Sequence, residues 1–367
     1  SQGGTLERTA TFPGGCGGAD VPVVPTAYGD PPLVAALRAQ PEDFQVEELL
    51  GFDADGEGEH ALLCVEKRGA NTRWVAGQLA REAGVAVREV GYSGLKDRHA
   101  VTVQHFTVPA ARGAAIEDWV GREGEGFRVL GASRHRRKLR PGSHRANRFR
   151  ILLRDPRGDF ASFEARLAEV SKLGVPNYFG PQRFGRGNAN LGRARRWAES
   201  GRAPQRRGDR AFALTAARSW LFNRVLAERV SRGDWSRILA GEAVILEGSR
   251  SFFQAPANDP TLQDRCERMD LHPSGPLWGR GEPQSADEAR ALELRVLEAE
   301  QPLQRLLEKE GMEQERRSLR LPVRALGCTA EGGGLRLDFE LSRGAFATAV
   351  LHEFVLGAWD VDADGSG

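Results

Sequence analysis

The sequence predicts an α+β protein in which a helix-rich segment interrupts a strand-rich domain. Apolar residues alternate with a two-residue period up to about residue 155, recur every three to four residues up to about 304, and then alternate again. The first period is typical of half-buried strands, and the second is typical of amphipathic helices. We therefore expect residues 31–155 and 305–358 to form one domain around an inserted domain at 156–304.

The first strand-rich part contains one helical pattern. Trp74, Leu79 and Ala83 have helical spacing, and Asn71 or Thr72 could cap a helix over 72–83. Strands are expected to begin at Phe44 and Ala61 and to cover 87–93, 103–109, 126–132 and 147–153. The two-residue period places four residues of the last strand on one face: Asn147, Phe149, Ile151 and Leu153.

The remaining elements follow from the same periodicities. Helices are expected at 160–173, 189–199, 211–231, 286–299 and 345–357, and the clearest strand of the chain at 335–341. Residues 1–30 are rich in Gly and Pro and poor in large apolar groups, so we expect a flexible N-terminal arm. The acidic Gly/Ser segment 359–367 is expected to be a flexible tail.

Composition favours a cytoplasmic enzyme. The hydrophobic content of 40% and charged content of 28% are typical of a soluble globular protein, and no apolar run approaches the roughly 20 residues needed to span a bilayer. The four cysteines (Cys16, Cys64, Cys266 and Cys328) are isolated, so we expect neither a disulfide framework nor a metal site. No exposed apolar stripe stands out, and a monomer without a protein partner is the simplest expectation.

Charge is unevenly distributed although the net charge is only +2. Ten Lys or Arg and no acid lie between Arg128 and Arg154, whereas ten acids and four cations lie between Glu282 and Glu315. Such segregation can create a positive cleft for nucleic acid. The candidates for contact with RNA phosphates are Arg134, Arg136, Arg137, Lys138 and Arg140. A solvated charged loop is the alternative for this run, and the set Arg193, Arg195 and Arg196 is a weaker candidate.

The segment Gly91–Gln104 carries the most informative group of the chain. Asp97 lies between Lys96 and Arg98, and neighbouring positive charge favours the ionised form of a carboxyl group. The segment also reads as a loop, where catalytic groups are often found. Lys-Asp-Arg triplets are common on protein surfaces, so the residues alone favour a solvated turn between two strands.

Four further motifs occur with this segment, and the set resembles the TruD family of pseudouridine synthases, which modify tRNA. They are Pro41–Glu48, the run Asn147–Phe149 before Arg154, Asn177–Gly185 and Gly344–Thr348. The resemblance covers roughly residues 33–357, and several ordered motifs are far more specific than one. It implies a mixed-sheet pseudouridine synthase catalytic domain interrupted by a mostly helical TRUD insertion domain, with a cleft between them.

The resemblance also implies an activity. The family isomerises a D-arm uridine of tRNA, at position 13, by breaking the C1′–N1 bond and joining C1′ to C5 without a cofactor. The matching catalytic carboxylate is Asp97, and its basic partner is Arg38 or Lys96. The sequence leaves open whether Asp97 attacks the sugar, attacks the base or removes a proton.

The same resemblance implies the residues that bind the uridine. Phe149 matches the aromatic residue of the family's site, Asn147 could bind the uracil edge, and Phe44 and Phe346 are expected in the pocket. Without the resemblance these three phenylalanines would be core residues. The chain departs from the pattern where Arg145-Ala146 replaces an expected Gly and where His105 replaces a frequent Trp. The motif Asn177–Gly185 could shape the domain hinge or the cleft.

Two other functions remain open. A non-catalytic RNA-binding or chaperone protein could use the same scaffold. A glycosidase would need a second acid, for which Glu47, Glu48 and Glu89 are available. A phosphate-binding loop is absent, His352-Glu353 lacks the second His of a zinc protease, and Leu95 interrupts a hydrolase elbow.

Overall fold

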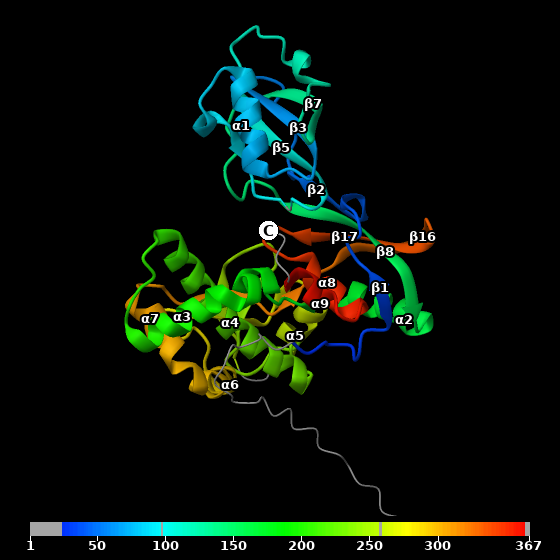
Figure 1. The fold of residues 1–367 in the computed structure, drawn as a ribbon. Coiled ribbons are helices and arrows are strands. Elements are labelled where there is room, and N and C mark those ends of the chain that lie inside the picture. Colours follow the sequence, from blue (N-terminus) through cyan, green and yellow to red (C-terminus); the bar gives the residue numbers. More distant parts are fainter. Residues whose placement is uncertain (1–23, 97, 257–258, 364–367) are drawn as a thin grey trace, which may run out of the picture.

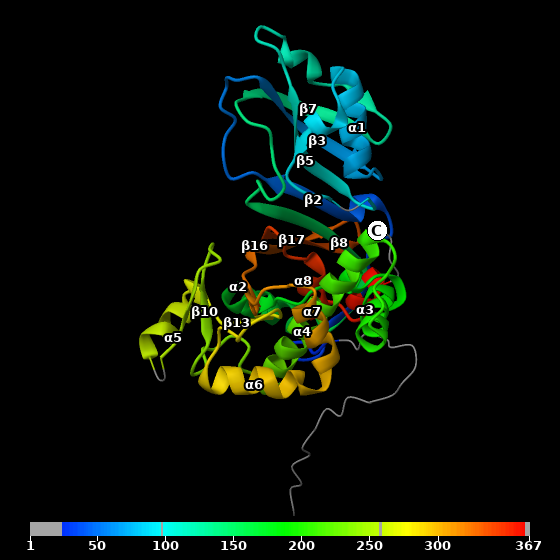
Figure 2. The same ribbon diagram turned by 90° about the vertical axis from the view of Figure 1, so that its left-hand side faces the viewer.

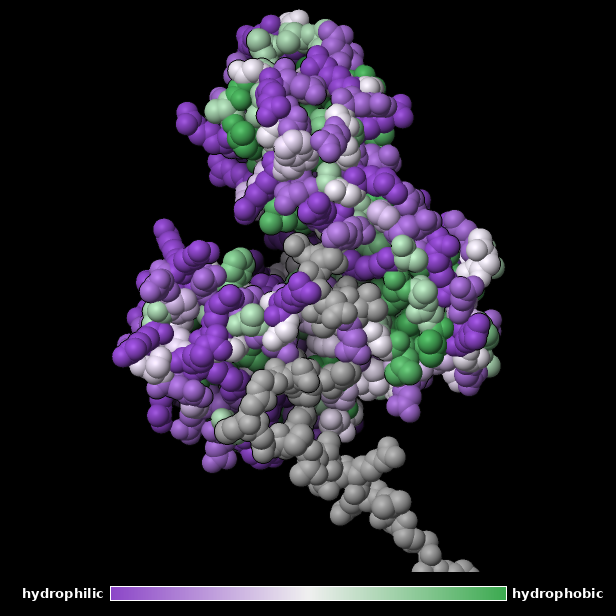
Figure 3. Space-filling model, viewed as in Figure 1, coloured by the Kyte–Doolittle hydropathy of each residue, from purple (hydrophilic) through white to green (hydrophobic). Residues whose placement is uncertain are grey.

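The protein has two lobes joined by one large sheet (Figures 1 and 2). The structure, a computed structural model, describes residues 24–96, 98–256 and 259–363. The smaller lobe, at the top of Figure 1, contains the helix α1 (Thr72–Ala83) and strands β3 to β7. The larger lobe contains the other α-helices of the described residues. Figure 3 shows the molecule from the same side as Figure 1. Hydrophilic residues cover much of the visible surface, and this surface is indented between the two lobes.

The large sheet has ten strands. They are β1 (Leu33–Ala36), β2 (Phe44–Leu49), β3 (His60–Arg68), β4 (Gly91–Tyr92), β5 (Val101–Pro109), β6 (Glu123–Gly124), β7 (Phe127–His135), β8 (Ala146–Gly158), β16 (Arg324–Glu331) and β17 (Gly334–Ser342). The main path is β16-β17-β8-β2-β5-β3-β7-β6, with β1 on β8 and β4 on β5. The pair β2 and β5 is parallel, whereas the others are antiparallel, so the expected mixed sheet is confirmed.

The C-terminal strand β17 returns to the sheet beside β8. Their register runs from Leu335 opposite Leu153 to Ser342 opposite Ala146. Strands from before and after the helix-rich segment thus pair in one sheet. This arrangement confirms the predicted α+β class. The alternation predicted for β8 is also present, because Asn147, Phe149, Ile151 and Leu153 are all buried.

Helices cover the sheet in two places and bury two separate cores. Helix α1 packs its apolar side against β3, β5 and β7. Helices α2 (Phe160–Leu173) and α8 (Ala347–Phe354) pack against β2, β8 and β17. Asn71 caps α1 as predicted, because its Oδ1 accepts a hydrogen bond from the Arg73 N–H at 2.8 Å. Gly84 ends the helix with φ of 69°, a left-handed conformation that glycine adopts without strain.

A third core belongs to the inserted segment. Its main helices are α3 (Ala189–Ser200), α4 (Arg207–Arg232), α6 (Asp287–Leu297) and α7 (Gln301–Lys309), with α5 (Pro260–Glu267) beside them. Short strands complete it: β9 (Val175–Pro176), β10 (Ala243–Leu246), β11 (Phe252–Gln254), β12 (Leu271–His272), β13 (Ser274–Leu277), β14 (Glu315–Ser318) and β15 (Arg320–Leu321). Periodicity in the sequence does not predict these strands, because each is too short to show a period.

The packing indicates that the insertion begins and ends later in the chain than the boundaries 156–304 that periodicity predicts. Phe163 and Val170 of α2 lie in the same core as β8 and β17, so α2 belongs with the large sheet. β9 pairs with β15. The point where the chain enters the helical core therefore lies beside the point where it leaves. We therefore propose that the insertion begins near residue 176 and ends near residue 320.

Three local expectations change in the structure. Within the strand expected at 87–93, only Gly91–Tyr92 is extended, because Val87–Glu89 forms a 3-10 turn. Residues 24–30 of the expected arm are packed, since the Ala27 N–H donates to Glu353 Oε1 at 2.9 Å. Residues 358–363 form the helix α9 (Ala358–Ala363), so the chain is still helical where the tail was expected to begin.

A charged pair attaches the start of β2 to β8. Arg154 on β8 donates from Nε to Asp43 Oδ2 at 2.6 Å and from Nη2 to Oδ1 at 2.8 Å. Asp43 is only 1% exposed and directly precedes Phe44. The hydrogen bonds from Arg154 hold the pKa of the Asp43 carboxyl group below its usual range, although burial opposes this.

We expect Arg154→Gln to lower the free energy of unfolding at pH 7 by about 2 kcal/mol, because it leaves a buried carboxylate without its cation. Since the folded-state pKa of Asp43 is depressed, this contribution is present above about pH 4 and is lost as the pH falls further. Urea unfolding at pH 7 and pH 3 measures both effects. Arg150→Gln is the matched control, because its side chain on the same strand is 49% exposed. An equal loss in both variants would contradict a special role for Arg154.

Candidate active site

The β2–β8 pairing brings two motif residues together, and Arg38 lies against one of them. The rings of Phe44 on β2 and Phe149 on β8 meet edge to face, with centroids 6.0 Å apart. The guanidinium carbon of Arg38 lies 3.9 Å from the centroid of Phe44. Arg38 has φ of 52°, a left-handed conformation that is uncommon for a residue with a Cβ and marks a local constraint.

The two rings are mostly buried in this structure. Phe149 also stacks on Phe339 of β17 at 5.3 Å, and it is 6% exposed, while Phe44 is 3% exposed. Both therefore belong to the sheet core as well as to the motif. A base could touch only a small part of the Phe149 ring in this arrangement.

Glu48 is the central charged group on this face of the sheet. It lies opposite Asn147 across the β2–β8 pair and is 1% exposed. Its Oε2 lies 3.0 Å from Lys96 Nζ, and its Oε1 accepts a hydrogen bond from the His105 N–H at 3.2 Å. The His105 imidazole Nδ1 is 3.5 Å from the same oxygen. From the sequence, Glu48 was a candidate only as a second acid for a glycosidase.

Electrostatics keep Glu48 ionised despite its burial. Burial alone raises the pKa of Glu48, but the hydrogen bond with His105 and the charge of Lys96 outweigh it and lower the pKa. Burial likewise opposes the charged form of His105, yet Cys64 and Glu48 raise the pKa of His105 to about 9. The cluster therefore holds one buried anion between two cations.

The loop before residue 97 is fixed by this cluster and by α1. The Lys96 N–H donates to Thr72 Oγ1 at 3.1 Å, and that hydroxyl donates to Gln104 Oε1 at 3.1 Å. Gln104 in turn donates from Nε2 to the Gly94 carbonyl at 3.2 Å. Asp97 itself lies outside the described residues. The main chain and side chain of Lys96 are both held, so the residue that precedes the predicted catalytic acid has a defined position.

Asn147 offers a buried acceptor on the same face. It is 8% exposed, and its Oδ1 accepts no hydrogen bond from the described part of the chain. Its Nδ2 lies 3.5 Å from His144 Nε2. A Cβ on Gly94 would lie 3.5 Å from His144 and 3.6 Å from the Lys96 ammonium, so these groups surround that glycine. Buried amide oxygens usually have partners, so this one is suited to a donor on a ligand.

Phe346 lies in a different group from Phe44 and Phe149. It precedes α8, and its ring centroid is 6.5 Å from that of Phe179 in the Asn177–Gly185 motif. Arg183 of the same motif stacks 5.6 Å from the Phe346 centroid. The four predicted substrate-binding residues therefore form two groups, one on the sheet and one at the junction with the insertion.

Much of the predicted basic run is used within the protein. Arg134 donates to the carbonyls of Gly58, Ala111 and Ala114 at 3.0, 3.2 and 2.6 Å. Arg136 forms an ion pair with Glu57, and the Lys138 ammonium donates to the Arg88 carbonyl. Arg137 and Arg140 are exposed. Arg134, Arg136 and Lys138 thus have internal partners, while contact of the five residues with RNA stays a prediction.

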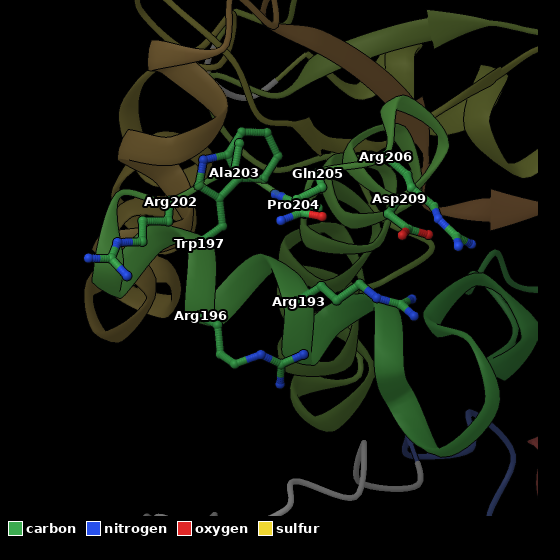
Figure 4. Close-up of a pocket in the computed structure, with 9 residues that line it drawn as sticks. All are labelled: Arg193, Arg196, Trp197, Arg202, Ala203, Pro204, Gln205, Arg206 and Asp209. Atoms are coloured by element: carbon green, nitrogen blue, oxygen red, sulfur yellow. The ribbon is translucent and has the colours of Figure 1, made fainter.

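A second basic surface lies on the insertion (Figure 4). Its pocket has a cavity volume of about 370 Å³ and lies at α3 and the start of α4. Four arginines line it, together with Trp197 and Asp209: Arg193, Arg196, Arg202 and Arg206. Within the described residues, none of the four is ion-paired, whereas the neighbouring Arg195 binds Glu300 at 3.1 Å. The set Arg193, Arg195 and Arg196 was the sequence signal for this surface.

The described residues give no sign of a metal site or a membrane span. Within them, no three His, Cys, Asp or Glu side chains are grouped so that they could hold a metal ion. None of their helices is long and apolar enough to cross a bilayer.

We expect Glu48→Gln to lower the pKa of His105 from about 9, because the variant removes the buried anion. In the wild type, the raised pKa of His105 stabilises the fold below about pH 6.5, and this contribution is lost as the pH rises through 9. Histidine NMR titration measures the pKa directly. Glu47→Gln is the control, since Glu47 binds Arg148 at 3.3 Å instead. An unchanged His105 titration in Glu48→Gln would show that the two groups are not coupled.

Comparison with known proteins agrees with the motifs. Residues 26–192 and 209–354 match the family model described as tRNA pseudouridine synthase D (TruD). The tRNA pseudouridine synthase D of Nitrosococcus oceani is 49% identical over 334 residues, which cover 90% of this chain and 93% of the relative. That of Methylococcus capsulatus is 47% identical over 333 residues, covering 90% and 94%.

A solved structure supports the fold. The putative tRNA pseudouridine synthase D (TruD) from Methanosarcina mazei superposes with a TM-score of 0.67 and 21% identity, covering 90% of this chain and 96% of that one. The family model spans most of the chain, and the bacterial relatives are nearly half identical over nine-tenths of it. This chain therefore belongs to the tRNA pseudouridine synthase D (TruD) family.

Proposed function

We propose that this protein isomerises a D-arm uridine of tRNA, position 13 in the family, to pseudouridine, with Asp97 as the catalytic carboxylate. The observation that carries the proposal is family membership over nearly the whole chain, with the Asp97 motif present. The buried bonds of Lys96 support it, because they fix the residue directly before the acid.

The reaction needs a carboxylate and neither an oxidant nor a phosphate donor. The C1′–N1 bond of the uridine breaks, the uracil turns, and a C1′–C5 bond forms. The proton on C5 then leaves, and N1 gains a proton, so the product is an isomer of the substrate. An ionised Asp can act as nucleophile or base in such a sequence.

We take Arg38 as the basic partner of Asp97 because of its place against Phe44 of the Pro41–Glu48 motif. Lys96 already forms an ion pair with Glu48 at 3.0 Å, so its charge is largely compensated. Arg38 stacks on Phe44 beside the sheet face that carries Asn147 and Phe149. We assign Lys96 and Glu48 to positioning the loop, and Arg38 to compensating the charge of the acid.

Asn147 is our candidate for recognising the uracil edge. Its buried Oδ1 can accept a hydrogen bond from a ring N–H, and its amide can donate to a carbonyl. Since uracil presents both kinds of group, one Asn could hold the base before and after it turns. The buried aromatic cluster of Phe44 and Phe149 would form the floor beneath it.

The contacts of the three candidate second acids argue against a glycosidase. Glu47 binds Arg148, Glu48 binds Lys96, and Glu89 accepts a hydrogen bond from the Ala86 N–H at 2.9 Å. An acid already held by a cation or a backbone donor is less available to protonate a leaving group.

We expect Asp97→Asn to bind unmodified tRNA normally but to lose isomerisation, because the amide cannot serve as a carboxylate nucleophile or base. Tritium release from C5-labelled uridine in bulk tRNA measures turnover, and a gel shift measures binding. Asp118→Asn is the control, an exposed acid in the same lobe. Residual turnover in Asp97→Asn would contradict the assignment. Wild-type binding without tritium release would favour an RNA chaperone, and release of free uracil would favour a glycosidase.

We expect Arg193→Gln combined with Arg196→Gln to weaken tRNA binding, because both side chains line the arginine pocket. The slope of log affinity against log salt should fall by about 0.7–0.9 for each phosphate that the variant no longer neutralises. Filter binding at several salt concentrations measures this slope. Arg250→Gln, an exposed arginine between β10 and β11, is the control. An unchanged slope in the double variant would remove the pocket from the RNA interface.

A further inference from the structure

Two arginines from distant parts of the chain share one aromatic ring at the junction between sheet and insertion. The guanidinium carbon of Arg317 on β14 lies 3.9 Å from the centroid of Phe179. That of Arg183, in the 3-10 turn Pro181–Phe184, lies 5.0 Å from the same centroid. Arg183 also stacks 5.6 Å from Phe346, which directly precedes α8. Both arginines therefore belong to the insertion, and Phe346 of the catalytic domain packs beside one of them.

The other inward-facing arginines of the insertion have strong acceptors. Arg229 binds Glu242 at 3.0 Å, and Arg316, the neighbour of Arg317, binds Glu293 at 2.6 Å. The buried Arg320 donates to His272 and to two main-chain carbonyls. These contacts follow the general rule that a guanidinium withdrawn from water is matched by acceptors or by opposite charge.

Arg183 and Arg317 lack such a match within the described residues. Arg317 donates only to Asn177, at 3.2 Å to its carbonyl and 2.9 Å to its Oδ1. No acceptor for the N–H groups of Arg183 and no carboxylate for either guanidinium is present in the described part of the chain. Burial lowers the pKa of Arg183, and burial together with the charge of Arg183 lowers the pKa of Arg317 to about 9.

Stacking alone does not explain a second cation on the ring. One arginine over Phe179 would give the cation–π attraction without repulsion between like charges. The two guanidinium groups lie against the same ring and present several N–H donors. An anion with several oxygens, such as a phosphate, satisfies both groups at once and removes the repulsion.

We propose that Arg183 and Arg317 bind one RNA phosphate that flanks the uridine in the active site. The proposal rests on the proposed function, because Arg183 stacks on Phe346, which the family resemblance implies for the uridine pocket. It also gives the Asn177–Gly185 motif a role. Asn177 holds Arg317, and Phe179 is itself fixed by Asn223, whose amide donates to the Phe179 carbonyl at 2.9 Å and accepts from its N–H at 2.9 Å.

A chemical double-mutant cycle tests the contact. Unmodified tRNA is assembled with a single neutral methylphosphonate on the 5′ or the 3′ side of the target uridine, and its binding to wild type and to Arg183→Gln is measured. At one of the two positions, we expect the methylphosphonate alone and Arg183→Gln alone each to weaken tRNA binding about tenfold. Combining the two changes should weaken binding no further than either one alone. Effects that multiply at both positions would overturn the proposal.

Two further measurements separate this proposal from its rivals. Arg186→Gln, an exposed arginine three residues away, should show effects that multiply with the methylphosphonate at both positions. Absence of coupling in Arg183→Gln, with a lowered unfolding midpoint and normal tRNA binding, would instead show that the arginine only supports the fold. Tritium release by the wild type tests the proposed function separately. Normal turnover with independent effects rejects the phosphate site alone, whereas absent turnover rejects the isomerase proposal.

Discussion

The register of β8 between β2 and β17 is the constraint on which the candidate site depends. Asn147 lies opposite Glu48 on one side and Leu341 on the other, and Phe149 lies opposite Val46 and Phe339. A shift of one residue in either pairing would turn Asn147 and Phe149 to the other face of the sheet. The β17 pairing closes only after the whole insertion has been traversed, so the integrity of the site is tied to the complete fold.

Charge on the molecule is arranged in two ways. In the interior, carboxylates and cations are matched: Glu48 with Lys96 and His105, and Asp43 with Arg154. Around the insertion, several arginines are not matched by acids within the described residues, both in the pocket of Figure 4 and on Phe179. Matched pairs fix the scaffold, while unmatched cations suit a polyanion. A net charge of +2 is therefore compatible with binding RNA.

The junction between sheet and insertion contains stacked aromatic rings and arginines. Phe179 contacts both Phe222 of α4 and Phe346 before α8, so one ring connects the helical core to the C-terminal part of the large sheet's domain. Arg183 and Arg317 of the insertion stack on the same ring. The Asn177–Gly185 motif therefore lies at this junction, and its role as hinge or cleft stays a prediction.

Local patterns in the sequence were sufficient for local structure. The spacing of 72–83 and the capping Asn71 determined α1, and the alternation of 147–153 determined which residues of β8 are buried. Motifs identified the family because they occur in order along one chain. Periodicity failed where an element was too short to have a period, as in β9 to β15, or where a turn replaced extended chain at Val87–Glu89.

Tertiary structure alone decided which charged and aromatic groups act together. Glu48 and the His105 N–H it binds are 57 residues apart in the sequence, and Arg183 and Arg317 come from different halves of the insertion. The sequence likewise did not reveal that Arg134 donates its hydrogen bonds to three carbonyls of other segments. Nor did it reveal that Phe346 packs on Phe179 and away from Phe44. A sequence records the chemistry of each side chain, but the energy of a charge or a ring depends on its neighbours in space.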